Sequence, residues 1–435
     1  MTEPLAIVII TLFCLLLAGS PVIFAIGCAG LIYFIVKPGM WAVLSVYPHK
    51  FFTGMDSFVF LCIPLFLIAG EVMGRTGMSD RVVRFAQLIV GRFRGGLAYV
   101  NVLANMLFGG ISGSALADIS ALGPVIINLM KSDGYTGKFS TALTVSSAIQ
   151  GPIIPPSIPM VIFASLTNTS VGALFLGGAI PGVMIGLSQM AVVRLKANKS
   201  QFPKRKIEGL NSRMAAKIVM EAFWALMMPV IILGGMISGV FTATEAAAVA
   251  VFYSLLVGGL IYRELTFKKM WAILDSAVRT TATIYLIIAF TSIVSWVLAS
   301  ERVPDIINRF VQTYHFSPAV FLLLANLFFL FNGCWISDTV QLLLFAPLFT
   351  PIFERMGVHP IHFGVIMVVN VMIGLLTPPY GTALYLGSAV GKEKLSDLVP
   401  ECMPFILASI LILFLITYIP SLVLWLPTKM GLILR

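Results

Sequence analysis

Charged side chains are scarce in this chain of 435 residues, because Asp, Glu, Lys and Arg together make up only 11% of it. An ordinary soluble domain has about 25%. Apolar residues make up 59%, and the mean hydropathy is +1.01. A soluble fold cannot bury that much apolar surface in one core. The composition therefore excludes a soluble enzyme, a nucleic-acid-binding protein and a disordered scaffold, and it predicts a protein embedded in the lipid bilayer.

Residue types that hold metals or perform covalent catalysis are also few. The five cysteines lie within apolar stretches and have no CxxC spacing, which argues against a disulfide framework and a zinc site. The four histidines form no HExxH motif, and the pair Gly137-Lys138 lacks the spacing of a nucleotide-binding Walker motif. The sequence therefore predicts neither an enzyme nor a bound cofactor or transition metal.

Apolar segments suited to a bilayer follow one another along the chain. They cover residues 57–73, 95–130, 139–168, 171–193, 219–240, 242–262, 280–300, 317–352, 361–391 and 402–428. The uncharged stretch 4–36 before them would be about 50 Å long as a helix, against a hydrocarbon core of about 30 Å. It forms either one long tilted span or two short spans broken at Gly19-Ser20-Pro21. The basic amphipathic pieces 75–94 and 265–279 are expected to lie as helices at the membrane surface.

The two halves of the chain repeat the same order of motifs. Four matches occur in order, at offsets of 220 to 223 residues: Ala104-Asn105 with Ala325-Asn326, Gly113-x4-Asp118 with Gly333-x4-Asp338, Pro124 with Pro347, and Pro155-Pro156 with Pro378-Pro379. Five full spans separate the two copies, and because five is odd, the second copy would cross the membrane in the opposite direction. Inverted repeats with broken helices are typical of secondary transporters.

Each copy contains two irregular segments. Segments 95–130 and 317–352 are predicted to be re-entrant helical hairpins, since irregular backbone at membrane depth must be covered by protein or line a cavity. Segments 139–168 and 361–391 are predicted to be helices broken at their Pro-Pro pairs. The predicted fold is thus an all-α integral membrane protein with an inverted repeat. Its topology puts 20 basic residues on cytoplasmic loops and 7 outside, as the positive-inside rule expects.

The hairpin tips and helix breaks form the candidate site. The first tip is Gly109-Gly110-Ile111-Ser112-Gly113-Ser114, and the first break is Gln150-Gly151-Pro152-Ile153-Ile154-Pro155-Pro156-Ser157. Serine hydroxyls and freed carbonyls are hard oxygen ligands suited to sodium, although close packing of small residues also explains such a tip. Gly374-Leu375-Leu376-Thr377-Pro378-Pro379-Tyr380-Gly381 mirrors the first break.

Two acids lie within apolar segments, Asp118 and Asp338. Acids at such depth are costly and usually functional, but a polar contact that orders each hairpin is an equal alternative. Helix N-termini at the tips would present positive dipole ends, which favour an anionic substrate.

These motifs together resemble a known family. They are Phe108-Gly-Gly-Ile-Ser-Gly-Ser114 with Ala117-Asp118, Gly151-Pro-Ile-Ile-Pro-Pro-Ser157, Ile63-Pro-Leu-Phe-Leu-Ile-Ala-Gly70, Arg94-Gly-Gly-Leu97 and Leu174-Phe175-x4-Ala179-x-Pro181-Gly182. In this combination the chain resembles, over nearly its whole length, the large membrane subunit of tripartite ATP-independent periplasmic (TRAP) transporters.

The resemblance implies sodium-coupled uptake of an organic anion, such as a C4-dicarboxylate, a keto or sugar acid or a sialic acid, across the bacterial inner membrane. It implies a periplasmic substrate-binding protein and a separate small four-helix membrane subunit as partners, and no cofactor besides the coupling ion. The implied fold is similar to elevator transporters of the ion-transporter type. Scaffold helices with their arms would occupy 1–94 and 219–314, a basic cytoplasmic loop 196–218, and the two transport-domain repeats 95–195 and 315–428.

The resemblance also implies site residues. One sodium site would use Ser112, Ser114, Gly151, Ile154 and Pro156. By repeat symmetry, a second would use Asn332, Gly333, Cys334, Gly374, Thr377 and Pro379, although its tip departs from the Ser-Gly-Ser pattern. The candidates for facing the substrate are Ser114, Asp118, Pro155, Ser157, Asp338 and Tyr380.

Two other functions remain open at this point. The chain could be a one-component sodium–anion symporter or antiporter of the same superfamily, which needs no binding protein. It could also be an intramembrane enzyme with Asp118 and Asp338 as an aspartyl pair, but the flanking motifs of such an enzyme are missing.

Overall fold

In the computed structural model the described residues, 3–199, 212–379 and 381–433, form helices joined by short connections, with no strand among them. Within those residues seven helical segments are long and apolar enough to cross a membrane. Two of them extend beyond a single α-helix: Phe58–Arg75 includes α4 (Cys62–Arg75), and Ala243–Ile261 includes α12 (Ala243–Leu256). The other five are α7 (Ala115–Ser132), α10 (Val171–Lys199), α11 (Ser212–Ile237), α13 (Phe267–Ser300) and α19 (Leu395–Tyr418). The chain is thus an all-helical membrane protein.

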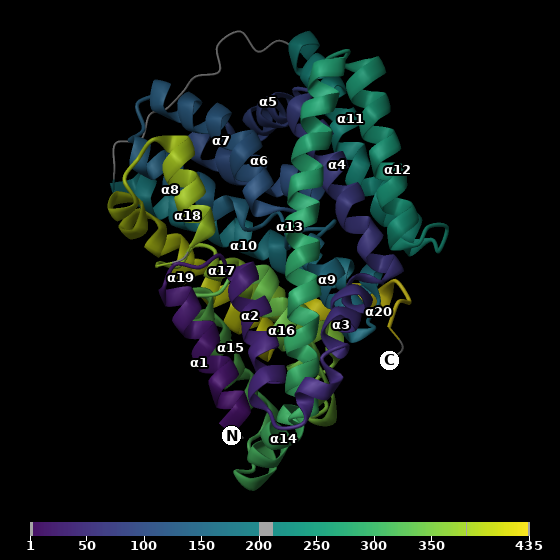
Figure 1. Ribbon diagram of the computed structural model, residues 1–435. Coiled ribbons are helices and arrows are strands. Elements are labelled where there is room, and N and C mark those ends of the chain that lie inside the picture. The colour runs from purple at the N-terminus through teal and green to yellow at the C-terminus, as the bar shows by residue number, and fades with distance from the viewer. Residues whose placement is uncertain (1–2, 200–211, 380, 434–435) are drawn as a thin grey trace.

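The uncharged N-terminal stretch forms two helices, α1 (Glu3–Leu17) and α2 (Val22–Val36). The turn between them holds Gly19 at a φ of +80°, which favours glycine, and Pro21 caps α2, where the missing N–H is not needed. The two helices pack side by side, as Figure 1 shows in purple at the lower end of the view. Each is about 22 Å long, so neither crosses a full hydrocarbon core.

Of the two expected surface helices, one forms and the other does not. The first is α5 (Met78–Val90), an amphipathic helix as predicted. The sequence predicts a second over 265–279, but the structure continues that piece without a break into α13. No Gly or Pro interrupts residues 267–300, and charge alone does not end a helix. The separate amphipathic helix is instead α14 (Val303–Thr313).

Two helix pairs occupy the positions of the predicted hairpins. α6 (Gly96–Ser112) meets α7 across Gly113 and Ser114, and α15 (Pro318–Gly333) meets α16 (Asp338–Arg355) across residues 334–337. The second connection is two residues longer than the first. The repeat register therefore shifts at the tip.

This shift corrects one of the sequence matches. Asp118 is the fourth residue of α7, and the fourth residue of α16 is Gln341, whereas Asp338 is the first. The pairing of Asp118 with Asp338 is therefore wrong, and Gln341 is the structural counterpart of Asp118.

The two Pro-Pro segments interrupt helices as expected. α8 (Gly137–Ala148) and α9 (Ile158–Thr167) flank the first break, and α17 (Pro360–Gly374) and α18 (Thr382–Gly391) flank the second. Both Pro-Pro bonds, Pro155-Pro156 and Pro378-Pro379, are cis. The breaks fall where proline cannot donate to the helical ladder.

The two halves pack by the same rule. α6 and α7 both lie against α8, and α15 and α16 both lie against α17; in addition, α7 lies against α18 and α16 against α9. Figure 1 places α6 and α7 in the upper part of the molecule and α15 and α16 in the lower part. Thus α18 of the second half packs on the second arm of the first hairpin, and α9 of the first half packs on the second arm of the second hairpin.

A polar pair fixes each hairpin's first arm to the neighbouring broken helix. Asn101 Nδ2 donates to Thr144 Oγ1 at 2.7 Å, and Asn370 Nδ2 donates to Asn326 Oδ1 at 2.9 Å. All four side chains are fully buried, so these hydrogen bonds replace water that the groups cannot reach.

The remaining helices surround this repeat. α4 packs between α12 and α13, and α13 also contacts α2, α3 (Val46–Met55) and α16. α10 packs on α19 and α20 (Ser421–Lys429). α13, the long green helix that runs through the middle of Figure 1, therefore contacts both the N-terminal helices and the second helix pair.

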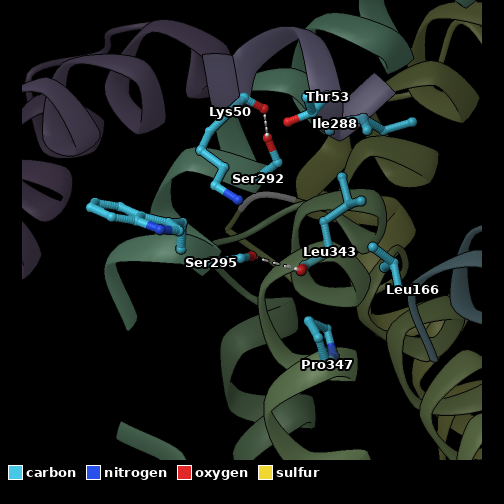
Figure 2. Close-up of a pocket in the computed structure, with 10 residues that line it drawn as sticks. Lys50, Thr53, Leu166, Ile288, Ser292, Ser295, Leu343 and Pro347 are labelled. Atoms are coloured by element: carbon cyan, nitrogen blue, oxygen red, sulfur yellow. Dashed lines mark hydrogen bonds between the residues drawn. The ribbon is translucent and has the colours of Figure 1, made fainter. Parts of the chain in front are cut away.

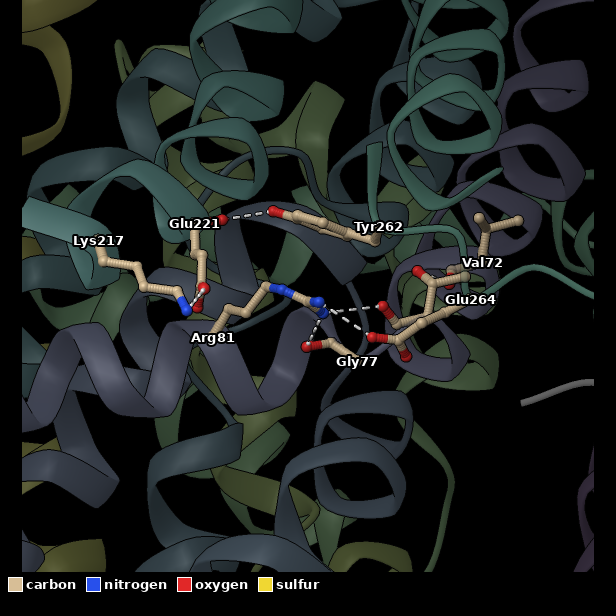
Figure 3. Close-up of polar contacts among 8 residues, drawn as sticks. Val72, Gly77, Arg81, Lys217, Glu221, Tyr262 and Glu264 are labelled. Atoms are coloured by element: carbon tan, nitrogen blue, oxygen red, sulfur yellow. Dashed lines mark hydrogen bonds and ion pairs between the residues drawn. The ribbon is translucent and has the colours of Figure 1, made fainter. Parts of the chain in front are cut away.

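An arginine ties α5 to the helices beside it (Figure 3). Arg81 Nη2 lies 3.0 Å from Glu264 Oε1, and its guanidinium lies 3.8 Å from the centre of the Tyr262 ring. Arg81 Nη1 donates to the carbonyl of Gly77 at 2.9 Å, and the Tyr262 hydroxyl donates to the carbonyl of Glu221 in α11 at 2.5 Å. Arg81 thus connects α5 to the end of the α12 segment, and Tyr262, which its guanidinium covers, continues the connection to α11.

We expect Arg81→Leu to lower the free energy of unfolding by about 1–2 kcal/mol, because it removes the ion pair and the cation–π contact together. The melting temperature in detergent should fall by roughly 2–4 °C. Arg279→Leu is the matched control, because its ion pair with Asp275 is solvent-exposed at 77% and 53%. Equal melting temperatures for the two variants would contradict the connecting role of Arg81.

Candidate functional site

A cavity of about 480 Å³ lies where the two tips, the first break and α13 meet. Ser114 comes from the first tip, Pro152 from the first break, and Ser337 and Asp338 from the second tip. Thr280 and Thr283 of α13 and the turn between α1 and α2 close it from the other side. The cavity is thus walled by both halves of the repeat and by the helices around it.

Five helices begin at this cavity. Its lining includes the first residues of α2, α7, α9, α16 and α18, which are Val22, Ala115, Ile158, Asp338 and Thr382. Each N-terminus carries about half a positive charge, so five of them together favour an anion. Among the described lining residues there is no Lys, Arg or His. Backbone dipoles and hydroxyls therefore supply the positive potential that this cavity offers.

The first tip is pressed against the first break through glycine. A Cβ at Gly109 would lie 2.4 Å from Cα of Gly151, and one at Gly113 would lie 2.7 Å from the carbonyl oxygen of Pro156. Gly113 also has a φ of +64°, and its carbonyl accepts from the N–H of Ile158 at 3.4 Å. Only residues without a side chain allow this approach.

Oxygen atoms gather where tip and break meet. The Ser112 hydroxyl donates to Asp118 Oδ1, and the N–H of Ser114 donates to Ser112 Oγ at 3.2 Å. Asp118 Oδ2 is buried without a hydrogen-bond partner among the described residues, and a Cβ at Gly151 would lie 2.2 Å from it. A buried carboxylate oxygen without a partner is costly, and a cation would satisfy it.

The carbonyls of the first break add to this group. Those of Gly151, Ile154 and Pro156 accept no hydrogen bond from the described residues, whereas the carbonyl of Gln150 accepts two and that of Pro152 accepts one. Oxygens from Ser112, Asp118 and this break fit a small hard cation in chemistry. The structure thus brings the predicted residues of the first sodium site to one tip-and-break contact.

The second half repeats the contact with different chemistry. A Cβ at Gly333 would lie 2.7 Å from Cα of Gly374. The carbonyls of Gly374 and Thr377 accept from the N–H groups of Thr377 and Gly381, and that of Pro379 accepts from the Tyr385 hydroxyl at 3.1 Å. These carbonyls retain only their second lone pair for another partner.

Polar side chains at the second tip are likewise bonded locally. Asn332 Nδ2 donates to the carbonyl of Phe328 at 2.8 Å, and Cys334 Sγ to that of Leu330 at 3.7 Å. Gln341 Nε2 donates to the carbonyl of Ile336, and its Oε1 is buried with no partner among the described residues. Sequence reasoning missed Gln341. Its offset of 223 from Asp118, the same as that of the proline pairs, was the signal that could have found it.

The residues predicted to face the substrate lie in different parts of the site. Ser114 and Asp338 line the cavity, whereas Asp118 is buried behind the first tip. The Ser157 hydroxyl donates to the carbonyl of Pro152 and accepts from the N–H of Met160, so it caps α9. The carbonyl of Pro155 lies beside Gly110, and Tyr380 lies outside the described residues.

A second cavity of about 390 Å³ lies between α3 and α13 on one side and α9 and α16 on the other (Figure 2). Lys50 is the one basic residue among its described lining, and its amine points into the cavity. Ser292 Oγ donates to the carbonyl of Lys50 at 2.7 Å, and Ser295 Oγ to that of Leu343 at 3.4 Å. The hydropathy pattern gave no sign of this cavity.

Within the described residues, no group of three or more His, Cys, Asp and Glu side chains is placed to hold a metal ion. These four residue types are the usual ligands of transition metals. A site of serine hydroxyls and backbone carbonyls is of another kind.

Comparisons with known proteins agree with this architecture. The family model described as "Tripartite ATP-independent periplasmic transporter, DctM component" matches residues 9–422. The chain is 38% identical to the sialic acid TRAP transporter large permease protein SiaM of Vibrio cholerae, over 95% of this chain and 96% of that one. It is 35% identical to the C4-dicarboxylate TRAP transporter large permease protein DctM of the same organism, over 97% of both.

Among solved structures, the chain is similar in fold to the YdaH transporter of Alcanivorax borkumensis. The TM-score is 0.59 at 14% sequence identity, over 88% of this chain and 89% of that chain. At this identity the likeness concerns the fold alone.

Proposed function

The chain belongs to the DctM family of tripartite ATP-independent periplasmic transporter components, and from this premise we propose that it takes up an organic anion by coupling to sodium. As a large TRAP permease it is a multi-pass protein of the inner membrane and a transporter, not an enzyme. The observation that carries the proposal is the cavity at which five helix N-termini meet and whose described lining contains no basic side chain.

An anionic cargo suits this cavity. Each helix N-terminus is worth about 0.3–1 kcal/mol to a nearby anion, and up to about 2 kcal/mol where it is partly buried. The hydroxyls of Ser114, Ser337 and Thr382 can donate to carboxylate oxygens. The relatives named above transport sialic acid and C4-dicarboxylates, and both are carboxylates. We therefore place the cargo of this chain in the class of carboxylates and related organic anions.

Sodium is the coupling ion in this proposal. The cavity wall already contains the carboxylate of Asp338, and Asp118 lies buried behind the first tip. A further anion at that depth is costly unless cations offset it. Sodium bound by Ser112, Asp118 and the carbonyls of Gly151, Ile154 and Pro156 would do so and would hold tip against break. Ser114 stays in the proposed set through its place at the tip.

The proposed second sodium site uses Asn332, Gly333, Cys334, Gly374, Thr377 and Pro379. Its support is the mirrored glycine contact between Gly333 and Gly374. Gln341 would take the place of Asp118 there, so this site would lack the buried negative charge of the first.

Transport would follow an elevator movement of an inverted repeat. Its support is the mirrored packing of α6 on α8 and of α15 on α17, in which the second arms α7 and α16 also contact α18 and α9 of the other half. The transport domain would comprise 95–195 and 315–428, and the scaffold 1–94 and 219–314. The cavity beside Lys50 lies between α3 and α13 of this scaffold and α9 and α16 of this transport domain, at the contact along which such a movement would slide.

The proposed partners are a separate small four-helix membrane subunit and a periplasmic substrate-binding protein. The family description supports them, because it names one component of a tripartite system. Family membership also disfavours a one-component symporter, in which a binding protein has no role.

We expect uptake to require a sodium gradient, the binding protein and the small subunit together. Reconstituted into proteoliposomes with both partners, the chain should accumulate a labelled carboxylate when sodium is outside. If net positive charge moves inward with the cargo, an inside-negative potential should stimulate uptake, because the potential contributes about 2.3 kcal/mol per charge per 100 mV. Undiminished uptake in the absence of sodium would refute the coupling, and full uptake without the binding protein would favour a one-component transporter.

A further inference from the structure

We infer that a pocket between the α5–α6 connection and α10 is a binding site for an anionic phospholipid, with the lipid phosphate held by Arg94 and Arg194. The pocket measures about 500 Å³. Val90 lines it from the end of α5, Phe93 and Arg94 from the α5–α6 connection, Tyr99 from α6, and Met190, Ala191, Arg194 and Ala197 from α10. This site is separate from the tips and breaks, and it does not rest on the proposed transport cycle.

Two arginines line this pocket, and no carboxylate among the described lining residues balances their charge. Arg94 and Arg194 are both exposed, and neither takes part in any of the ion pairs found within residues 3–199, 212–379 and 381–433. The described lining contains no acid. Guanidinium groups bind phosphate oxygens bidentately, so the charge of the pocket is complementary to a phosphate.

The walls suit a lipid better than a free ion. Phe93 and Tyr99 pack edge to face with ring centres 6.3 Å apart, and the Arg92 guanidinium lies 5.7 Å from the Phe93 ring centre. Aromatic rings of this kind are enriched where headgroups meet acyl chains. Val90, Met190 and Ala191 provide an apolar surface beside them, along which an acyl chain can lie.

The backbone positions the first arginine. Gly95 has a φ of +78°, and a Cβ at Gly96 would lie 2.1 Å from the carbonyl oxygen of Gly91. The connection therefore closes tightly and holds Arg94 between α5 and α6. α5 lies at the upper end of the molecule in Figure 1. The segments 75–94 and 194–217 are the two connections richest in Lys and Arg, and basic pockets between membrane helices bind anionic headgroups.

The test measures lipid-dependent thermal stability of the purified full chain in detergent. Phosphatidylglycerol should raise the melting temperature in a saturable way, and phosphatidylethanolamine should not. The Arg94→Gln/Arg194→Gln double variant should bind phosphatidylglycerol about 25-fold more weakly, because each basic residue at a membrane surface contributes about fivefold. Arg309→Gln, which removes an exposed arginine of α14, is the matched control and should bind as the unaltered chain does.

Three results would overturn the proposal. One is equal affinity of the double variant and the unaltered chain for phosphatidylglycerol. Another is the same stabilisation by inorganic phosphate at equal concentration, which would indicate a site for the free ion. The third is loss of the small subunit from the double variant with lipid affinity unchanged, which would make this surface a protein interface. Native mass spectrometry of the double variant tests retained fold and retained lipid in one measurement.

Discussion

Replacing Gly109 by alanine is expected to reduce uptake to the background of empty vesicles. The added methyl group would lie 2.4 Å from Cα of Gly151, and backbone cannot move aside as a flexible side chain does. Forcing a methyl group into a packed contact costs about 1–3 kcal/mol or more. The first tip would separate from the first break, and the oxygen atoms that meet there would no longer share one ion. Initial uptake rates in proteoliposomes at matched protein content measure the effect.

The control is Gly234→Ala in α11. Gly234 is also a helical glycine, but a Cβ there meets nothing within 4 Å, and alanine favours helix by up to about 1 kcal/mol. Uptake by this variant should be unchanged. Gly333→Ala, whose methyl group would lie 2.7 Å from Cα of Gly374, should be as harmful as Gly109→Ala. Normal transport by Gly109→Ala would disprove the close contact of tip and break.

Replacing Asp118 by asparagine is expected to weaken the apparent affinity for sodium by about 10- to 100-fold. A contact made by a charged group contributes about 1.5–3 kcal/mol relative to no contact. Each 1.4 kcal/mol corresponds to a tenfold change in affinity. Asparagine keeps the shape and can still accept from the Ser112 hydroxyl, so the fold should persist. Uptake measured against sodium concentration separates the change in sodium affinity from a change in maximal rate.

Ser112→Ala provides the comparison for this variant. It removes one oxygen ligand and the hydrogen bond to Asp118 Oδ1, but it keeps the negative charge, so its effect on sodium affinity should be the smaller of the two. Melting temperatures of both variants in detergent, with and without sodium, check for loss of fold. If Asp118→Asn keeps the sodium dependence of the unaltered chain, the carboxylate has no part in the ion site.

Much of the fold was predictable because the bilayer restricts the possibilities. Interrupted helices were foreseeable at Pro155-Pro156 and Pro378-Pro379, since proline lacks the N–H that a helix uses. Residues 4–36 were ambiguous because hydropathy does not register a turn at Gly19. The piece 265–279 misled because its charges resemble those of a surface helix, whereas the absence of Gly and Pro lets α13 continue.

The candidate site was predictable in its first half and less so in its second. Ser112 ends α6, and Gly113 and Ser114 are the two residues that connect it to α7, so sequence order and spatial order agree. The second tip is two residues longer, and Asp338 therefore matched Asp118 in sequence while Gln341 matches it in space. The cavity beside Lys50 depends on contacts between helices far apart in the chain, and no local pattern encodes such contacts.

The shortness of α1 and α2 bears on the membrane itself. Each is about 22 Å long, and large apolar side chains on both, including Ile10, Leu17, Phe24 and Ile35, are exposed. The bilayer beside them must become several ångströms thinner than usual, or polar groups at the helix ends must lie within the hydrocarbon. The cost is fractions of a kcal/mol per ångström of mismatch between helix and bilayer. A locally thinned bilayer shortens the distance between the two aqueous compartments at the side of the molecule where α1 and α2 meet the cavity. The lipid matrix would then be part of the transport path, and its thickness would set how far a carrier of this shape has to move.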